Sequence, residues 1–138
     1  MVLIPAQTEV GPIYEMLDGL IIMSEFEGLP VVLLEALAMG VPALSTDVGA
    51  IREVLERYGA GMVFSPPGDI SALERAFRVF VHRLGKFRAA AVKASDRVTE
   101  EFSTARMARE YDACFHRAMT EHGAAVRAAV PRQGDAPR

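Results

Sequence analysis

The sequence predicts an α/β fold: a Rossmann-like, parallel, doubly wound sheet flanked by helices, incomplete at its N-terminus and followed by a C-terminal helical segment. Short apolar runs alternate with helical patterns, which is typical of βαβ units. Of the 138 residues 51% are apolar, enough for a packed core. Length and composition therefore predict one globular domain or a part of one.

The first elements follow from apolar runs and helical spacing. Val2–Ile4 is predicted to be a short strand and Gly11-Pro12 a turn. Apolar residues recur at helical spacing over Ile13–Leu17. Leu20–Met23 is a continuous apolar run, as expected of a strand covered on both faces, and Ser24–Leu29 forms the loop after it. Ligands of doubly wound sheets bind at the carboxyl ends of strands, so this loop is the candidate site.

A helix and a second strand follow that loop. Pro30 suits the first helical position, and the predicted helix runs over Val31–Met39 and stops at Gly40. Val41–Ser45 is predicted to be another buried strand, and Asp47–Gly49 a turn. The order strand, helix, strand predicts a parallel pair.

The next segment carries a helix, a strand and an amphipathic helix. Ala50–Arg57 is predicted to be a helix and Met62–Phe64 a short strand. Asp69 suits the N-cap of a helix that runs to about Leu84. The apolar stripe of that helix consists of Ile70, Leu73, Phe77, Phe80, Val81 and Leu84.

The last third is predicted to be helical and then disordered. Lys86–Phe102 forms one helix, and Ser103 or Thr104 caps another that runs to about Glu121. The apolar stripe of this helix places Cys114 in the core. Gly123–Arg138 is rich in Ala, Pro and Arg and is predicted to be a disordered tail. Residues 1–122 are then the folded domain.

Charge and composition exclude several classes of protein. All 15 Lys and Arg residues follow position 51, so the first half lacks the bases that nucleic-acid binding needs. A single Cys excludes a disulfide scaffold, and the three His residues lack partners at metal-ligand spacing, so no metal site is expected. No apolar run reaches the roughly 18 residues that span a bilayer.

Two glutamates flank the start of the Val31–Met39 helix. Glu35 is the one charge in this apolar helix, and a buried carboxylate needs a partner or a ligand. Its Cβ points toward the helix N-terminus and so toward the Ser24–Leu29 loop, which contains Glu27. The helix N-terminus itself favours a phosphate. Carboxylates that accept sugar hydroxyls, beside a helix end that accepts phosphate, fit a nucleotide sugar.

The residues alone leave other interpretations open. Glu35 could be paired with Arg52 or hydrogen-bonded by a loop amide, and Glu27 could be an ordinary solvated loop residue. Two acids also suit a glycosidase, which hydrolyses a bond between two carboxyl groups.

The segment SEFEGLPVVLLEALAMGVPALSTDVGAIREVL (Ser24–Leu55) resembles the Glu-x7-Glu region of the group 1 (family four) retaining glycosyltransferases, which are GT-B enzymes. Glu27 and Glu35 match the two motif glutamates. VFSPPGD (Val63–Asp69) and EFSTARMAREYDACF (Glu101–Phe115) are similar to later segments of the same family. The likeness extends from about Val2 to His122.

The resemblance implies a role for each matching residue. Glu35 would bind the ribose hydroxyls of a nucleotide-diphosphate sugar, and Glu27, in the catalytic position, would hold hydroxyls of the donor sugar. Amides around Gly28, Leu29 and Val31 would cradle the diphosphate and sugar, and Ser24 would line the same pocket. Transfer would retain the anomeric configuration, with no metal or other cofactor.

The family also implies parts that we expect this sequence to lack. Its members have a separate acceptor-binding domain, and the opening part of their donor domain supplies an Arg and a Lys against the diphosphate. The expected function is therefore the donor-binding portion of a glycosyltransferase, inactive alone. The alternative is a truncated or split-chain module that binds nucleotide weakly or assembles with a chain carrying the missing domain. The expected location is cytoplasmic, with peripheral attachment to the inner membrane surface left open.

Overall fold

The computed structural model describes the backbone of residues 2–129 and the side chains of residues 2–120. The chain divides into two compact units after Glu101. The elements of the first unit are α1 (Gly11–Glu15), β1 (Leu20–Ile22), α2 (Val31–Ala38), β2 (Ala43–Thr46), α3 (Ile51–Tyr58), β3 (Gly61–Phe64), α4 (Ile70–His82) and α5 (Leu84–Glu101). The second unit contains α6 (Thr104–Ala129).

The three strands form a parallel sheet in the order β1-β2-β3. Leu20 lies opposite Ala43, and Ala43 lies opposite Gly61, so the strands end at the same edge. The predicted fold class, a Rossmann-like parallel sheet flanked by helices, is confirmed.

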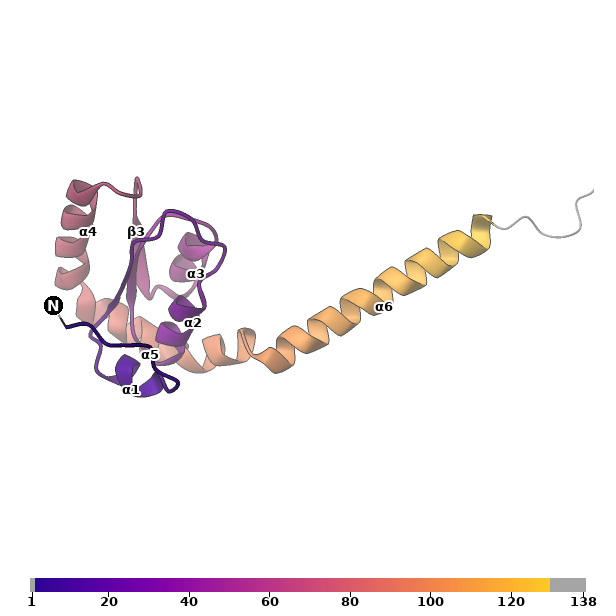
Figure 1. The fold of residues 1–138 in the computed structure, drawn as a ribbon, viewed down its shortest axis with the longest axis horizontal. Helices are drawn as coiled ribbons and strands as arrows, with labels where there is room; N and C mark the ends of the chain where they lie inside the picture. The colour runs from indigo at the N-terminus through magenta and orange to yellow at the C-terminus, as the bar shows by residue number, and fades with distance from the viewer. Residues whose placement is uncertain (1, 130–138) are drawn as a thin grey trace, which may run out of the picture. The chain divides into compact units, whose positions relative to one another are not determined.

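Alternation along the strands divides the core between the two faces of the sheet. Ile22 and Ala43 point to the face that packs against α2, α3 and α5. Leu44 and Phe64 point to the opposite face, which packs against α4 and the start of α5. Figure 1 shows the two layers, with α4 on one side of β3 and α2 and α3 on the other.

The prediction that the first apolar run is covered on both faces is wrong. Ile21 is 41% exposed, whereas its neighbour Ile22 is buried. Ile21 pairs with Leu44 and so points to the α4 face. The helix α4 packs against β2 and β3, which leaves this face of β1 open in the part of the chain that the structure describes.

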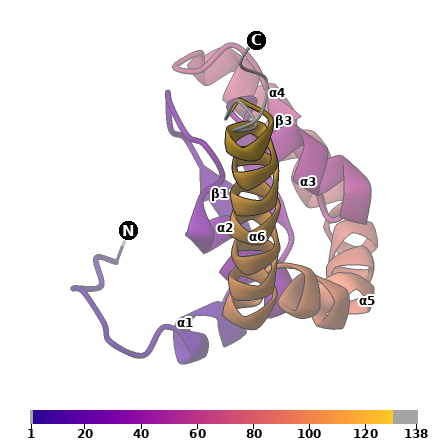
Figure 2. The same cartoon turned by 90° about the vertical axis from the view of Figure 1, so that its right-hand side faces the viewer.

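The predicted strand over Val2–Ile4 is also wrong. These residues have no strand conformation, and their side chains are 54–86% exposed. Figure 2 shows the segment extending from α1 away from the sheet, so no described strand supplies its hydrogen bonds. The predicted turn at Gly11-Pro12 is the first turn of α1, where a proline is tolerated because its missing N–H would be unpaired anyway.

The helix α4 is confirmed, but its buried face differs from the predicted stripe. Asp69 caps it, because its carboxylate accepts a hydrogen bond of 2.9 Å from the Ala72 amide. The buried residues are Ala72, Ala76 and Phe80, whereas Ile70, Phe77 and Val81 are 43–66% exposed. Small side chains bring the helix close to the sheet, and the large apolar residues flank that contact.

The helix α6 is longer than predicted. Ser103 caps it by accepting a hydrogen bond from the Arg106 amide, and it continues to Ala129. The predicted tail of residues 123–138 therefore begins within a helix, and residues 130–138 lie outside the described residues. The assignment of Cys114 to a core is wrong: it is exposed, because the second unit contains no other described element to cover it.

Candidate functional site

The candidate site lies where the first two strands end. The Ser24–Leu29 loop joins β1 to α2, and the turn with Val48 and Gly49 follows β2. Because the strands are parallel, both segments emerge at the same edge of the sheet.

A short chain of hydrogen bonds fixes the Glu27 carboxylate. The buried Thr46 hydroxyl, at the end of β2, donates to the Ser24 carbonyl oxygen at 2.6 Å. The Ser24 hydroxyl in turn donates to Glu27 Oε1 at 2.8 Å. Glu27 is half-buried, so it remains accessible while one of its oxygens is oriented. The structure thus brings Ser24 into contact with Glu27, although Ser24 is not among the residues that line the pocket beside it.

The loop and the turn touch through their main chains. The Ala50 amide donates to the Gly28 carbonyl at 2.8 Å. Gly49 has φ +55°, and a Cβ placed there would lie 2.2 Å from the carbonyl oxygens of Glu27 and Gly28. Only glycine permits this approach, so the position of the loop depends on Gly49.

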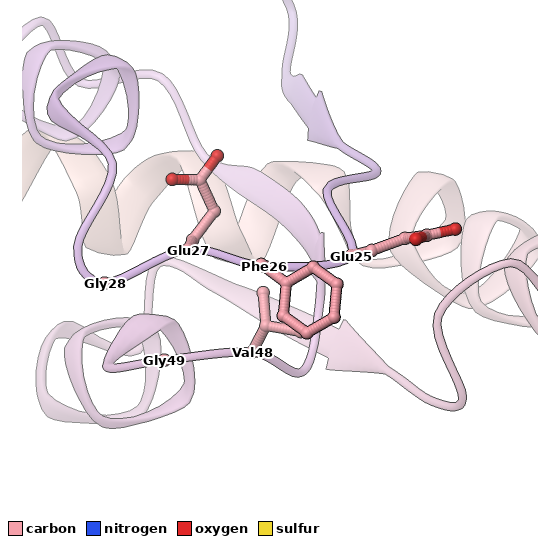
Figure 3. A pocket seen from close by; sticks show the side chains of 6 residues that line it. All are labelled: Glu25, Phe26, Glu27, Gly28, Val48 and Gly49. Atoms are coloured by element: carbon pink, nitrogen blue, oxygen red, sulfur yellow. The ribbon is translucent and has the colours of Figure 1, made fainter.

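An open pocket of about 590 Å³ lies between these two segments. It is lined by Glu25, Phe26, Glu27, Gly28, Val48 and Gly49. Figure 3 shows the carboxylates of Glu25 and Glu27 extending from the loop in different directions. The Phe26 ring is 90% exposed, so the pocket offers one oriented carboxylate beside an uncovered aromatic side chain.

The other predicted loop residues lie at the start of α2. Leu29 is half-buried and packs against the core, and Val31, the first residue of α2, is 66% exposed. Pro30 is the N-cap, and no side chain caps this helix end. The first amides of α2 therefore have no side-chain cap.

The prediction that Glu35 is buried is wrong. Glu35 is exposed and lies on the outer face of α2 with Val31 and Met39, because Leu33, Ala36 and Leu37 form the buried face. It does not line the pocket beside Glu27. Its carboxylate accepts a hydrogen bond of 2.7 Å from the Tyr14 hydroxyl of α1, a partner that the sequence analysis did not consider.

Arg52, the partner considered for Glu35, has other contacts. Its guanidinium donates to both carboxylate oxygens of Asp47, at 2.9 and 2.5 Å, and to Glu56 at 3.2 Å. These bonds lower the pKa of Asp47 below its usual value. Arg52 is thus held by two acids beside the turn that lines the pocket.

Sequence reasoning missed several residues of the site. Phe26, Val48 and Gly49 line the pocket, and Thr46 supports the loop. The glycine of the predicted turn after β2 was the available signal, because a turn at a strand end lies at the same edge as the loop. Tyr14 had no such signal, because its contact with Glu35 spans 21 positions.

The sequence model of the family described as "Glycosyl transferases group 1" matches residues 3–97. The chain belongs to the group 1 glycosyltransferases. It is 28% identical over 115 residues to N-acetyl-alpha-D-glucosaminyl L-malate synthase of Bacillus anthracis, covering 80% of this chain and 29% of that protein. It is also 28% identical over 114 residues to the lipopolysaccharide core biosynthesis mannosyltransferase LpsB of Rhizobium meliloti, covering 81% and 32%.

A solved structure shares the fold of this group 1 glycosyltransferase chain. Sucrose-phosphate synthase from Thermosynechococcus elongatus superimposes with a TM-score of 0.69 at 20% sequence identity. The match covers 81% of this chain and 28% of that one. The chain thus spans less than a third of the length of these relatives. Among the described helices, none has the length and apolar character to cross a membrane.

Proposed function

We propose that this chain binds a nucleotide-diphosphate sugar at the Ser24–Leu29 loop and serves retaining, metal-independent transfer of the sugar to an acceptor. The observation that carries the proposal is the oriented carboxylate of Glu27, held by Ser24 at 2.8 Å in an open pocket. A carboxylate fixed through one oxygen accepts ligand hydroxyl groups through the other at little further entropic cost.

Each end of the donor has a candidate partner in the proposal. Glu27 holds hydroxyls of the donor sugar, and the Glu35 carboxylate accepts the ribose hydroxyls. The amides around Gly28, Leu29 and Val31 at the uncapped start of α2 cradle the diphosphate, where the positive end of the helix dipole favours an anion.

The relatives support the substrate class. The name of one relative, N-acetyl-alpha-D-glucosaminyl L-malate synthase, contains a sugar group. The other is named as a mannosyltransferase of lipopolysaccharide core biosynthesis. Sugar transfer is therefore the proposed chemistry, and the cytoplasm is the proposed location.

The proposal is tested by titrating UDP-, GDP- and ADP-sugars and the bare nucleoside diphosphates into the full chain by calorimetry. We expect Glu27→Gln to weaken binding of the preferred nucleotide sugar by about tenfold, as expected for loss of a charge-assisted hydrogen bond, and to leave the bare diphosphate unaffected. Glu25→Gln is the matched control, because it removes the same charge from the same loop.

Two results would contradict the proposal. One is that no nucleotide sugar binds, which would favour the alternative of a module that assembles with another chain. The other is equal weakening by Glu25→Gln and Glu27→Gln, which would show that loop charge matters but not the oriented carboxylate.

A further inference from the structure

A hydrogen bond between two helices holds the Glu35 carboxylate. The Tyr14 hydroxyl of α1 donates to Glu35 Oε2 of α2 at 2.7 Å. Tyr14 is only 6% exposed and packs with Ala36 and Val41. Because close packing restricts the ring, the hydroxyl is presented to Glu35 in one place.

The short helix that carries Tyr14 is itself fixed to the body of the domain. Arg88 of α5 donates through Nη1 to the Leu17 carbonyl, just after α1, at 2.7 Å. The same α5 packs extensively against α2. The helix α2, which carries Glu35, and Leu17, which follows the helix that carries Tyr14, are thus both in contact with α5.

The bond leaves part of the Glu35 carboxylate available. Among the described residues, Tyr14 is the one hydrogen-bond donor to this carboxylate, and it uses Oε2. Glu35 is exposed, so Oε1 faces no protein donor in that part of the chain. An ionised carboxylate accepts about four hydrogen bonds, and therefore has capacity for a pair of ligand hydroxyls.

Tyr14 remains a donor over the whole physiological range of pH. Burial and then the hydrogen bond to Glu35 raise the pKa of Tyr14 to about 12. The phenol is therefore protonated wherever the protein functions, and the carboxylate never faces a second anion from it.

We infer that Tyr14 is a positioning residue that fixes the Glu35 carboxylate for the vicinal 2′- and 3′-hydroxyls of a ribose. This inference rests on the proposed function, in which Glu35 takes the ribose of the donor. An exposed Glu samples many rotamers, and a ligand that needs one of them must order it on binding. The bond from Tyr14 orders Glu35 in advance.

The experiment compares ribose and dideoxyribose ligands in the full 138-residue chain. The probes are UDP, GDP and ADP, followed by the 2′,3′-dideoxy form of whichever binds most tightly. The measured quantity is the dissociation constant of the dideoxyribose ligand divided by that of the ribose ligand. Both constants are determined on one sample of protein. A reduced folded fraction affects both constants equally, so the ratio stays informative even for a destabilised variant.

We expect Tyr14→Phe to lower this ratio about five- to tenfold, mainly by weakening the ribose ligand. Tyr58→Phe is the matched control, because Tyr58 is also buried and its hydroxyl also donates to a glutamate, Glu101. It should leave the ratio at the wild-type value. Glu35→Gln should lower the ratio as well, and adding Tyr14→Phe to it should change nothing further.

The outcomes separate this inference from the proposed function. If Glu35→Gln lowers the ratio and Tyr14→Phe does not, the inference is overturned and the donor site stands. A fall in the ratio for Tyr58→Phe equal to that for Tyr14→Phe would likewise overturn it. The wild-type chain could bind no nucleotide, or could bind the ribose and dideoxyribose nucleotides equally well. Either result would contradict the proposed ribose site, and with it the inference about Tyr14.

Discussion

At the scale of single residues, hydroxyl groups set the position of two accessible carboxylates. Thr46 supports Ser24, Ser24 orients Glu27, and Tyr14 orients Glu35. Each carboxylate remains reachable while a neutral donor fixes it. A neutral donor restrains a carboxylate without cancelling its charge, so the carboxylate keeps its strength as an acceptor.

Thr46→Val should lower the free energy of unfolding by about 1–2 kcal/mol, because the Ser24 carbonyl loses its donor within a partly buried contact. Urea denaturation measures this change. Thr99→Val is the control: Thr99 makes a similar bond to the Ser95 carbonyl, but on an exposed face of α5. Equal losses in the two variants would contradict a special role for the Thr46 bond.

Gly49→Ala should displace the loop as well as strain the backbone. A positive φ costs a non-glycine residue about 1–2 kcal/mol. Gly68→Ala provides that cost alone, because Gly68 has φ +81° and nothing lies within 4 Å of its Cβ position. We expect Gly49→Ala to be the more destabilising by at least about 2 kcal/mol in denaturant titrations, because two carbonyl oxygens must move. Equal denaturant midpoints for Gly49→Ala and Gly68→Ala would show that moving the loop does not lower the free energy of unfolding.

At the scale of elements, the end of α5 is tied to α3 by charge and hydrogen bonds. The Tyr58 hydroxyl donates to Glu101 at 2.5 Å, and Arg97 pairs with the same carboxylate at 2.9 Å. Arg97 also lies over the Tyr58 ring, 5.3 Å from its centre. The hydrogen bond from Tyr58, followed by that from Arg97, lowers the pKa of Glu101 to about 2.

This lowered pKa predicts acid sensitivity at a defined range of pH. The hydrogen bonds lower the pKa of Glu101 from the ordinary glutamate value of 4.5, which we take for the unfolded chain, to about 2 in the folded protein. The stabilisation is therefore complete above about pH 4.5 and is lost as the pH falls toward 2. Urea midpoints of wild type and Glu101→Gln between pH 6 and pH 2 test this. The two curves should converge on acidification, and parallel curves would contradict the prediction.

The sequence predicted elements better than the faces that they bury. The apolar runs located β1, β2 and β3 and the helices between them, because local spacing and Gly or Pro signals decide where such elements begin and end. Which face is covered depends on neighbours that are remote in sequence. Ile21 and Glu35 both read as buried from their apolar surroundings, and both are exposed.

The same limit applied to the candidate site. Glu27 was indicated by its place in the loop after a strand, which is local information, and Ser24 by the family resemblance. The two residues that form this hydrogen bond are only three positions apart. Tyr14 is supplied by a helix 21 residues away, so no local pattern indicated it. The predicted roles in donor binding remain predictions for all of these residues: Ser24, Glu27, Gly28, Leu29, Val31 and Glu35.

At the scale of the whole molecule, positive charge is scarce in the part of the sequence that forms the candidate site. No Lys or Arg precedes Arg52, and the guanidinium of Arg52 is held by Asp47 and Glu56. A diphosphate carries about two negative charges, whereas a helix N-terminus offers roughly half a positive charge. The described residues that line the pocket include no Lys or Arg, so the proposed diphosphate would meet less positive charge than its own negative charge.

We accordingly expect the isolated 138-residue chain to show no sugar transfer. The physical reason is the uncompensated diphosphate. The chain also spans less than a third of the relatives that it matches. Release of nucleoside diphosphate from UDP-, GDP- and ADP-sugars, with simple sugars as acceptors, measures the activity. The control is Glu27→Ala, and turnover by the wild-type chain above this control would contradict the prediction.

The contact between Gly49 and the Ser24–Leu29 loop has a further consequence for how the site can change. This contact is made by main-chain atoms, so it does not depend on which side chains the loop carries at Glu25 and Phe26. Glu25 and Phe26 project outward from it and are exposed. Substitutions at Glu25 and Phe26 would therefore alter the chemistry of the pocket rim, while the main chain of the loop keeps its position. In such a scaffold, new ligand preferences can evolve without refolding.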